Sequence, residues 1–264
     1  MNATQDRIFA PLGGRTIAIV NDMGAAAIFF AKAFWLIFRP KRLPAILDQL
    51  AHIGARTMGI VSLIGLFTGM VVALQVYYAL AKLGAEGMLG SAVGLGLIRE
   101  LGPVMTAIMI IARAGSSMTA EIGILRISEQ IDALQTMRID PLGYLISPRI
   151  AAAVVSFPLL TALFDAVGIA GGYFTGVILL GVNSGTYLDQ LQASVTTKDV
   201  VGGFVKALVF AIIVSTVCSF QGYFTHLRAD ARGAKSVSMS TTSAVVLSCV
   251  LVLVVDYVIT TFML

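Results

Sequence analysis

The sequence predicts an all-α integral membrane protein, with five transmembrane helices, an N-terminal interfacial helix and a cytoplasmic amphipathic helix. Of its 264 residues, 58% are hydrophobic and 12% are charged, whereas a soluble domain usually carries about a quarter charged residues. The mean hydropathy is +0.92. Five segments are apolar over the roughly 20 residues that a helix needs to cross the hydrocarbon core. Almost no sequence is left for a separate soluble domain.

The five predicted spans differ in length. They cover Met58–Ala81 and residues 91–112, 150–181, 200–224 and 242–264. The third is too long to cross upright, so we expect it to tilt, to kink near Pro158 or to project beyond the bilayer. Glycines recur one turn apart at Gly65/Gly69, Gly90/Gly94 and Gly168/Gly172/Gly176. This spacing favours close helix packing within the bundle, and it also fits a subunit interface.

Positively charged residues set the expected orientation. Lys and Arg number seven before the first span, four between the second and third spans, and three between the fourth and fifth. The two opposite loops contribute only Lys82 and Lys198. Because cytoplasmic loops carry the excess of Lys and Arg, the N-terminus is predicted to lie in the cytoplasm and the C-terminus on the outer side.

Residues 1–52 are interpreted as a cytoplasmic, interfacial region, and residues 53–264 as the transmembrane domain. Residues 23–38 are apolar but short for a span, are interrupted by Lys32 and carry Trp35 beside basic residues. We expect this segment to lie on, or dip into, the cytoplasmic leaflet. A sixth crossing is the alternative and would reverse the side of the N-terminus. A cleaved signal peptide is not expected, since no cationic region leads into a small-residue cleavage site.

Four of the five spans carry ionisable residues, namely Arg99, Glu100, Asp165, Lys206 and Asp256. A rise of about 1.5 Å per residue places them at a similar depth, in the outer half of the membrane. Charges in hydrocarbon are costly unless they pair or border a cavity. Opposite charges could neutralise one another and lock the bundle, above all at Asp165 and Asp256. Alternatively, the Arg99–Glu100 layer borders a cavity for a polar headgroup, where a planar guanidinium suits phosphate. Lys206 fits either this site or outward snorkelling.

Residues 116–137 predict an amphipathic helix on the cytoplasmic side. Its apolar stripe consists of Ile124, Ile127, Ile131 and Leu134, spaced as on one helix face. Ser116 or Ser117 could cap its start. Off this stripe, the segment carries three acids and one Arg, namely Glu121, Arg126, Glu129 and Asp132. A helix resting on anionic lipid would show the reverse balance, so a cytoplasmic partner protein is favoured over lipid.

Other chemistries are disfavoured. The net charge of +4 does not indicate nucleic-acid binding, because the basic residues are scattered between helices rather than gathered with aromatics on one face. Cys218 and Cys249 fall inside apolar spans and are interpreted as small buried hydrophobes. His52 and His226 have no metal-ligand company, so no metal site is predicted. The chain has no GxxxxGK[ST] phosphate-binding motif, so any ATP that drives it must be bound by another chain.

An ordered series of motifs resembles the MlaE/YrbE permease family. It comprises Ile98-Arg-Glu-Leu-Gly-Pro-Val104, Ala112-Arg-Ala-Gly-Ser116, Thr119-Ala-Glu-Ile-Gly123, Ser128-Glu-Gln-Ile-Asp-Ala-Leu134, Asp140-Pro141, Ser147-Pro148-Arg149 and Phe220-Gln-Gly-Tyr223. The likeness covers residues 45–264 and is specific because so many elements occur in order. The N-terminal arm fits loosely. Leu83 stands where some relatives carry a tyrosine, so aromatic contacts near that loop are not carried over.

The resemblance implies the membrane subunit of a bacterial ABC-type system that moves phospholipids and maintains outer-membrane lipid asymmetry. It implies an inner-membrane homodimer with two cytoplasmic ATPase subunits, which hold ATP and Mg, below a periplasmic hexameric ring of MCE-domain protein. Some systems add a STAS-domain protein. The implied lipid cavity opens toward the periplasm at the dimer interface, and its polar lining matches Arg99, Glu100 and Lys206. Residues 121–134 would form the coupling helix. The chain would then be a transport subunit, not an enzyme, with no cofactor of its own.

Two other function classes remain open. An ion-coupled secondary carrier would use Asp165, Asp256 and Lys206 as a proton relay. Co-purification of an ATPase, and transport without a proton gradient, would distinguish the ABC-type system from this carrier. A membrane scaffold for the ring and the ATPase would transport nothing, and bound phospholipid in the purified complex would argue against it.

Overall fold

The computed structural model describes residues 43–227 and 233–263, together with Gly24, Ala25, Ile28, Phe29, Ala31, Lys32 and Trp35. Every regular element among these residues is helical, and none of the described residues lies in a strand. Five of the helical segments are long and apolar enough to cross a membrane. The predicted fold class, an all-α membrane protein with five spans, is therefore confirmed.

The first three crossing segments are each built from several helices, whereas the last two are single helices. The first joins α2 (Leu43–Ile53), η3 (Ala55–Thr57) and α3 (Met58–Ala81). The second joins η4 (Glu86–Met88), α4 (Leu89–Gly96), the π-helical turn η5 (Leu97–Leu101), α5 (Gly102–Ile110), the π-helical turn η6 (Ile111–Gly115) and α6 (Ser116–Ile127). The short helix α7 (Gln130–Thr136) leads to the third, which joins η7 (Leu142–Ile146), α8 (Ser147–Tyr173) and η8 (Phe174–Leu179). Helix α9 (Ser184–Ser194) precedes the fourth, α10 (Thr197–Tyr223), and η9 (Thr225–Leu227) precedes the fifth, α11 (Ala234–Met263).

The first three segments are longer than a membrane is thick. They contain 39, 42 and 38 residues, against 27 and 30 in α10 and α11. At about 1.5 Å per residue, the three reach nearly twice the depth of a hydrocarbon core of about 30 Å. The third segment therefore has the length to project beyond the bilayer, one of the expected options, and α8 remains helical through Pro158.

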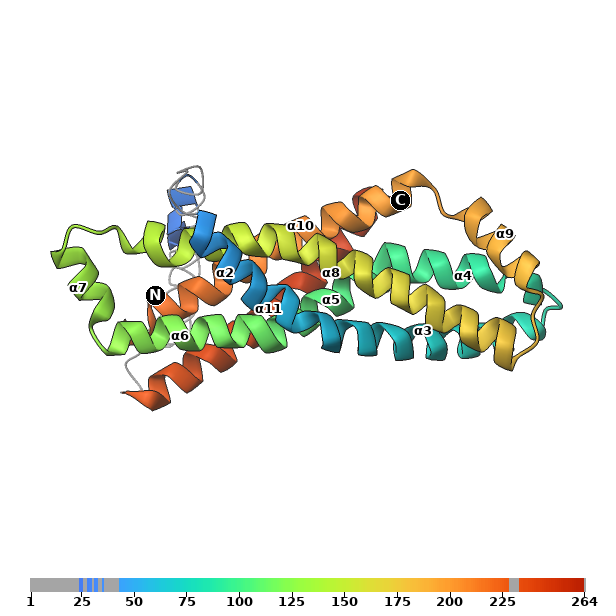
Figure 1. The fold of residues 1–264 in the computed structure, drawn as a ribbon, viewed down its shortest axis with the longest axis horizontal. Helices are drawn as coiled ribbons and strands as arrows, with labels where there is room; N and C mark the ends of the chain where they lie inside the picture. Colours follow the sequence, from blue (N-terminus) through green and yellow to red (C-terminus); the bar gives the residue numbers. More distant parts are fainter. Residues whose placement is uncertain are drawn as a thin grey trace, which may run out of the picture.

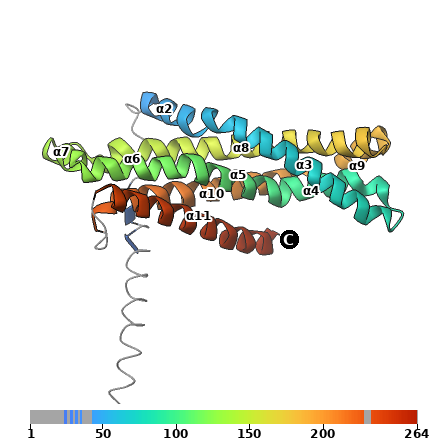
Figure 2. The ribbon, with the colours of Figure 1, turned by 90° about the horizontal axis from the view of Figure 1, so that it is seen from below.

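The segments lie side by side in an elongated bundle (Figure 1). Helix α7 lies at one end, and α9 lies with the α3–α4 connection at the other. Helix α11 runs along one edge of the bundle and α2 along the opposite edge (Figure 2). The last residues of α11 stop beside the start of α10, where Met263 comes close to Gly202. The start of α10 and the end of α11 therefore meet within the bundle, away from both of its ends.

Glycines let neighbouring backbones approach closely. The Gly168 carbonyl of α8 lies so near Gly69 of α3 that a Cβ at position 69 would overlap it. Gly90 of α4 meets the Tyr187 carbonyl of α9 in the same way. Packing within one bundle, the first interpretation of the glycine spacing, is confirmed at these positions.

Residues 116–137 do not form the single capped helix that the sequence predicted. Helix α6 continues directly from the second span, so the Ser116 hydroxyl donates to the Ala112 carbonyl of the preceding turn and caps nothing. Helix α6 ends at Ile127, and α7 begins after Glu129, which has a left-handed backbone with a φ of 59°. A left-handed residue interrupts the helical course of the chain. The coupling region therefore consists of a span extension and a separate short helix.

The predicted apolar stripe on this region is also wrong. Ile124 and Ile127 are exposed, whereas Ile131 is fully buried. Helix α6 instead buries Met118, Thr119, Ile122 and Gly123, because it is still packed inside the bundle against α10 and α11. The break at Glu129 reorients α7, so a stripe counted along one continuous helix does not describe both parts.

The predicted interfacial helix, residues 23–38, lies mostly outside the described residues. Its described members are helical. Trp35 is exposed, whereas Phe29 is buried against the rings of Phe220, Tyr223 and Phe224 near the end of α10. The two cysteines, both free thiols, are buried or partly buried, as expected for small hydrophobic residues.

Candidate functional site

Three of the five spans bring ionic side chains together at one level of the bundle. Arg99 and Glu100 lie on η5, Lys206 on α10 and Asp256 on α11. The Lys206 ammonium lies 2.7 Å from Glu100 Oε2 and 3.0 Å from Asp256 Oδ1. These side chains therefore share one level of the bundle, as a common depth requires. We refer to Arg99, Glu100, Lys206 and Asp256 as the ionic cluster.

A proline explains why Lys206 binds at this turn. In an α-helix the Arg99 carbonyl would accept the N–H of residue 103, but Pro103 has no N–H. The Lys206 ammonium takes that place and donates to the Arg99 carbonyl at 2.9 Å. The turn η5 is π-helical, a geometry that is frequent at functional sites. The sequence from Arg99 to Pro103 thus both places two charges and creates the backbone acceptor that anchors them.

Lys206 is buried, with 3% of its surface exposed, and is surrounded by acceptors. Besides the Arg99 carbonyl and Glu100, it donates to the Thr260 hydroxyl of α11 at 2.7 Å. An ammonium has three protons to donate, and a buried charge is tolerated only when it is fully partnered. Lys206 therefore locks η5 to α10 and α11. The alternative that this side chain snorkels outward is wrong.

Arg99 forms a separate ion pair that the sequence analysis missed. Its Nε lies 2.6 Å from Asp199 Oδ1. Asp199 also closes a capping box at the start of α10, because the backbone N–H and hydroxyl of Thr196 donate to Asp199 Oδ2 at 2.8 and 2.7 Å. The Thr-x-x-Asp spacing could have predicted the helix start. It carries no signal for a contact between residues 100 positions apart.

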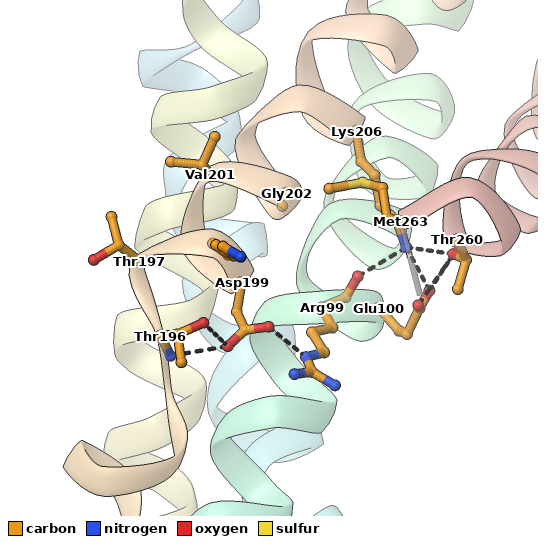
Figure 3. A pocket seen from close by; sticks show the side chains of 12 residues that line it. Arg99, Glu100, Thr196, Thr197, Asp199, Val201, Gly202, Lys206, Thr260 and Met263 are labelled. Carbon is orange, nitrogen blue, oxygen red and sulfur yellow. Dashed lines mark hydrogen bonds and ion pairs between the residues drawn. The ribbon is translucent and has the colours of Figure 1, made fainter.

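Three members of the ionic cluster, Arg99, Glu100 and Lys206, border a cavity of about 630 Å³ (Figure 3). The cavity is lined by Arg99, Glu100, Thr196, Thr197, Lys198, Asp199, Val201, Gly202, Gly203, Lys206, Thr260 and Met263. Arg99 reaches Asp199 through Nε, and its two terminal nitrogens extend away from that carboxylate (Figure 3). Among the described residues, neither terminal nitrogen has a hydrogen-bond partner. This volume lies within the range of small-molecule sites, and the open guanidinium edge fits an anionic group.

Asp165 does not join the ionic cluster. It lines a separate pocket of about 160 Å³, and its Oδ1 is packed against Gly102, with no hydrogen-bond partner in the described part of the chain. Gly203 borders both hollows, so Asp165 lies near the level of the ionic cluster. The intramembrane network nevertheless contains Asp256 and not Asp165. Lys206 and Asp256 are in contact, but no contact in the structure described connects Asp165 to either of them, so the proton relay is incomplete.

Three of the four residues expected to contact a cytoplasmic partner bind neighbours in their own chain. Glu121 Oε2 lies 3.0 Å from the buried Arg149 of α8. The Arg126 guanidinium lies 2.6 Å from Asp132 Oδ1, which joins α6 to α7. Glu129 is exposed, and its side chain has no ion pair or hydrogen bond within residues 43–227 and 233–263. Glu129 is thus the member of this set that presents an uncompensated charge.

Comparisons with known proteins match nearly the whole chain. The family model described as Permease MlaE matches residues 46–262. Over 250 residues the chain is 40% identical to a probable ABC transporter permease protein of Rickettsia bellii, covering 94% of this chain and 95% of the relative. Over 256 residues it is 40% identical to the intermembrane phospholipid transport system permease protein MlaE of Haemophilus influenzae, covering 96% and 95%. The matched region includes every residue of the ionic cluster.

Proposed function

Since the chain belongs to the MlaE permease family, we propose that it passes phospholipids between the inner membrane and a periplasmic MCE-domain carrier, and so maintains outer-membrane lipid asymmetry. Family membership makes it an ABC-type permease subunit of intermembrane phospholipid transport, whose ATPase is a separate subunit. The ion-coupled carrier receives no support, because no contact among the described residues links Asp165 to Lys206 or Asp256, and the Rickettsia bellii relative is named a probable ABC transporter permease. The same membership favours a transport role over a pure scaffold.

The assignment of the lipid site rests on the two terminal nitrogens of Arg99, which are free to donate hydrogen bonds within the described part of the chain. A phosphodiester is a singly charged anion whose two free oxygens match a pair of guanidinium N–H groups. Arg99 lines the cavity, and its two terminal nitrogens have no hydrogen-bond partner among the described residues. Lys206, by contrast, donates its hydrogen bonds to acceptors in its own chain. We therefore assign phosphate contact to Arg99. Glu100 and Lys206 form the polar wall that keeps η5 in place.

The second segment provides a mechanical route from an ATPase to this cavity. It is helical without a break from α4 through η5, α5 and η6 to α6, so α6 and the Arg99 turn belong to one rod. Closure of the nucleotide subunits on ATP would push α7 and α6. The push would reach η5 and collapse the cavity, moving a phospholipid to or from the carrier. In this mechanism ATP and Mg are held by the partner, and the chain contributes no cofactor.

The assembly expected from the family is a homodimer with two ATPase subunits on the α7 side, a hexameric MCE ring on the α9 side and, in some systems, a STAS-domain protein. The charge count favours the α7 end as cytoplasmic, with the C-terminus periplasmic and the protein in the bacterial inner membrane. Helix α11 leaves most of its apolar surface uncovered by the rest of the chain. That surface is available to lipid or to a second copy.

The decisive experiment replaces Arg99 and compares lipid transfer with assembly. Arg99→Ala removes charge-assisted hydrogen bonds worth about 1.5–3 kcal/mol, so transfer at limiting lipid should fall by about tenfold or more. The measurement is ATP-dependent movement of a labelled phospholipid from proteoliposomes that contain the complete complex. Lys198→Ala is the matched control, because it removes one cation from the same cavity wall without touching the fork of Arg99.

Each outcome is interpretable when ATPase co-purification is measured on the same preparations. Loss of transfer in Arg99→Ala, with normal assembly and near-normal transfer in Lys198→Ala, supports the proposed site. Equal transfer by Arg99→Ala and the wild type would reject it. Equal losses in the two variants would show that general positive charge, and not the guanidinium, attracts the lipid.

A further inference from the structure

We propose that Asp199 is a positioning residue for phospholipid binding: it grips Arg99 by Nε and thereby holds the terminal nitrogens of Arg99 open for a phosphate. This inference rests on the proposed function, because it assumes that Arg99 receives the lipid. Asp199 would then orient the Arg99 guanidinium as well as neutralise its charge.

Asp199 is itself held rigidly. One of its oxygens accepts from Arg99 Nε at 2.6 Å, and the other accepts both donors of Thr196. Its side chain is 9% exposed, against 43% for Arg99. Asp199 is therefore a partly buried carboxylate fixed at the start of α10, and it holds the more exposed Arg99 guanidinium in place beside the cavity (Figure 3).

The choice of nitrogen matters. A guanidinium offers five N–H groups in a planar fork. A carboxylate bound across both terminal nitrogens would occupy the edge that a phosphate needs. The contact through Nε leaves that edge with four N–H groups, and it removes rotational freedom that an unrestrained arginine would lose on binding. Preorganisation of this kind strengthens binding without adding any contact to the ligand.

A simple charge argument predicts the opposite effect. Asp199 is an anion close to the expected position of an anionic phosphate, so removing its charge should improve binding if Coulomb interactions alone decide. A competitor role, with Asp199 occupying Arg99 until lipid displaces it, also predicts tighter binding after its removal. The positioning role predicts weaker binding, so the sign of the effect separates these explanations.

The test measures equilibrium binding of a short-chain phosphatidylglycerol with a fluorescent acyl tail to the purified permease–ATPase complex in detergent. The variants are Asp199→Asn, Arg99→Ala and the double variant. Asp199→Glu tests rescue, because it restores a carboxylate to the same position. Asp189→Asn is the matched control, since it removes an equally charged but exposed residue from the neighbouring α9. Thermal unfolding and ATPase co-purification of each variant report on folding.

The expected result is binding about tenfold weaker in Asp199→Asn, as for losing one preorganised contact, with partial recovery in Asp199→Glu and no change in Asp189→Asn. In the Arg99→Ala background, Asp199→Asn should have no further effect, because its action passes through Arg99. Unchanged or tighter binding in Asp199→Asn, or a full additional loss in the double variant, would overturn the role of Asp199. Unchanged binding in Arg99→Ala would instead reject the lipid site itself, which distinguishes the two failures.

Discussion

At the scale of single residues, Lys206 decides whether the bundle tolerates two partly buried acids inside the predicted spans. One ammonium faces two carboxylates, Glu100 and Asp256, in a region surrounded by apolar helices. Both acids are stabilised by this one cation, which comes from α10, whereas the acids lie on η5 and α11. Removing the cation therefore affects three helices at once, whereas removing one acid leaves the other pair in place.

Lys206→Met should destabilise the protein severely. The substitution keeps the length of the side chain but leaves Glu100 and Asp256 without a counter-ion, at a cost near the lower end of about 3–5 kcal/mol because the Glu100 side chain is partly exposed. We expect a marked fall in the thermal unfolding temperature in detergent. Adding Glu100→Gln and Asp256→Asn should recover much of the loss, because neutral amides need no cation. A Lys206→Met protein as stable as the wild type would show that the acids are not charged in the fold.

His226 gives the α7 end a dependence on pH. Burial lowers the pKa of His226, and the charge of Arg126 lowers it further, so the neutral ring accepts a hydrogen bond from Arg126 Nε at 3.0 Å. The folded protein then binds this proton less readily than the unfolded chain, whose histidine has a pKa of about 6.5. Stability from this contact is present above that value and is lost as the pH falls below it. Thermal unfolding at about pH 7.5 and pH 5.5 should show a larger drop in the wild type than in His226→Gln. Equal drops would remove His226 from the explanation.

At the scale of elements, the crossing of α10 and η5 depends on one glycine. A Cβ at Gly203 would lie 2.7 Å from the Ile98 carbonyl, which is backbone and cannot move aside alone. The adjacent Gly202 provides a contrast, because a Cβ there would meet the flexible end of Met263 at 2.6 Å. The two positions are equally helical and differ in what a methyl group would displace.

Gly203→Ala should therefore separate α10 from η5, lower the unfolding temperature and weaken lipid transfer, whereas Gly202→Ala should have little effect. Overpacking of this kind costs roughly 1–3 kcal/mol, partly offset by the higher helix propensity of alanine. Unfolding temperature and lipid transfer are measured on both variants. If Gly202→Ala proves the more damaging, the crossing is not set by the approach to Ile98.

The split between α6 and α7 changes which residues should bind the ATPase. Glu121, Arg126 and Asp132 are engaged inside the chain, so we expect Glu129→Lys to abolish co-purification of the ATPase without lowering the unfolding temperature. A left-handed backbone is no harder for Lys than for Glu, so the variant tests charge alone. Asp189→Lys, at the opposite end of the bundle, is the control. Normal co-purification with Glu129→Lys would place the docking contact elsewhere.

For the molecule as a whole, the sequence predicts the level of each charged residue along its span well, but it predicts the rotation of each helix about its own axis poorly. Span number and the level of the charges follow from apolar length and a fixed rise per residue, which are local properties. Whether Asp165 faces Lys206 depends on how α8 is turned about its axis, which no local pattern fixes. The Arg99–Asp199 pair joins residues 100 positions apart, and the break at Glu129 depends on tertiary packing of α6. These features depend on how distant parts of the chain pack together, which a local sequence pattern does not encode.

The distribution of Lys and Arg along the chain predicts the orientation of the whole bundle. Fourteen Lys and Arg residues lie in the regions predicted to be cytoplasmic, and only Lys82 and Lys198 lie in the opposite loops. Because positive loops are retained in the cytoplasm during insertion, the α7 end should face the ATPase and the α9 end the carrier. Both native cysteines lie within helices of the bundle, so they can be replaced by alanine to give a background for labelling.

Single cysteines at the two ends should then react from opposite sides. Lys82 and Met137 are both exposed, so accessibility in the fold does not bias the comparison. In cells whose outer membrane admits a charged maleimide that cannot cross the inner membrane, Lys82→Cys should be labelled at once. Met137→Cys should be labelled only after the inner membrane is disrupted, and Lys235→Cys, in the first turn of α11 on the same predicted side, should behave like it. The reverse pattern would invert the protein, turn the Arg99 cavity toward the cytoplasmic half of the membrane, and remove the periplasmic carrier as its partner.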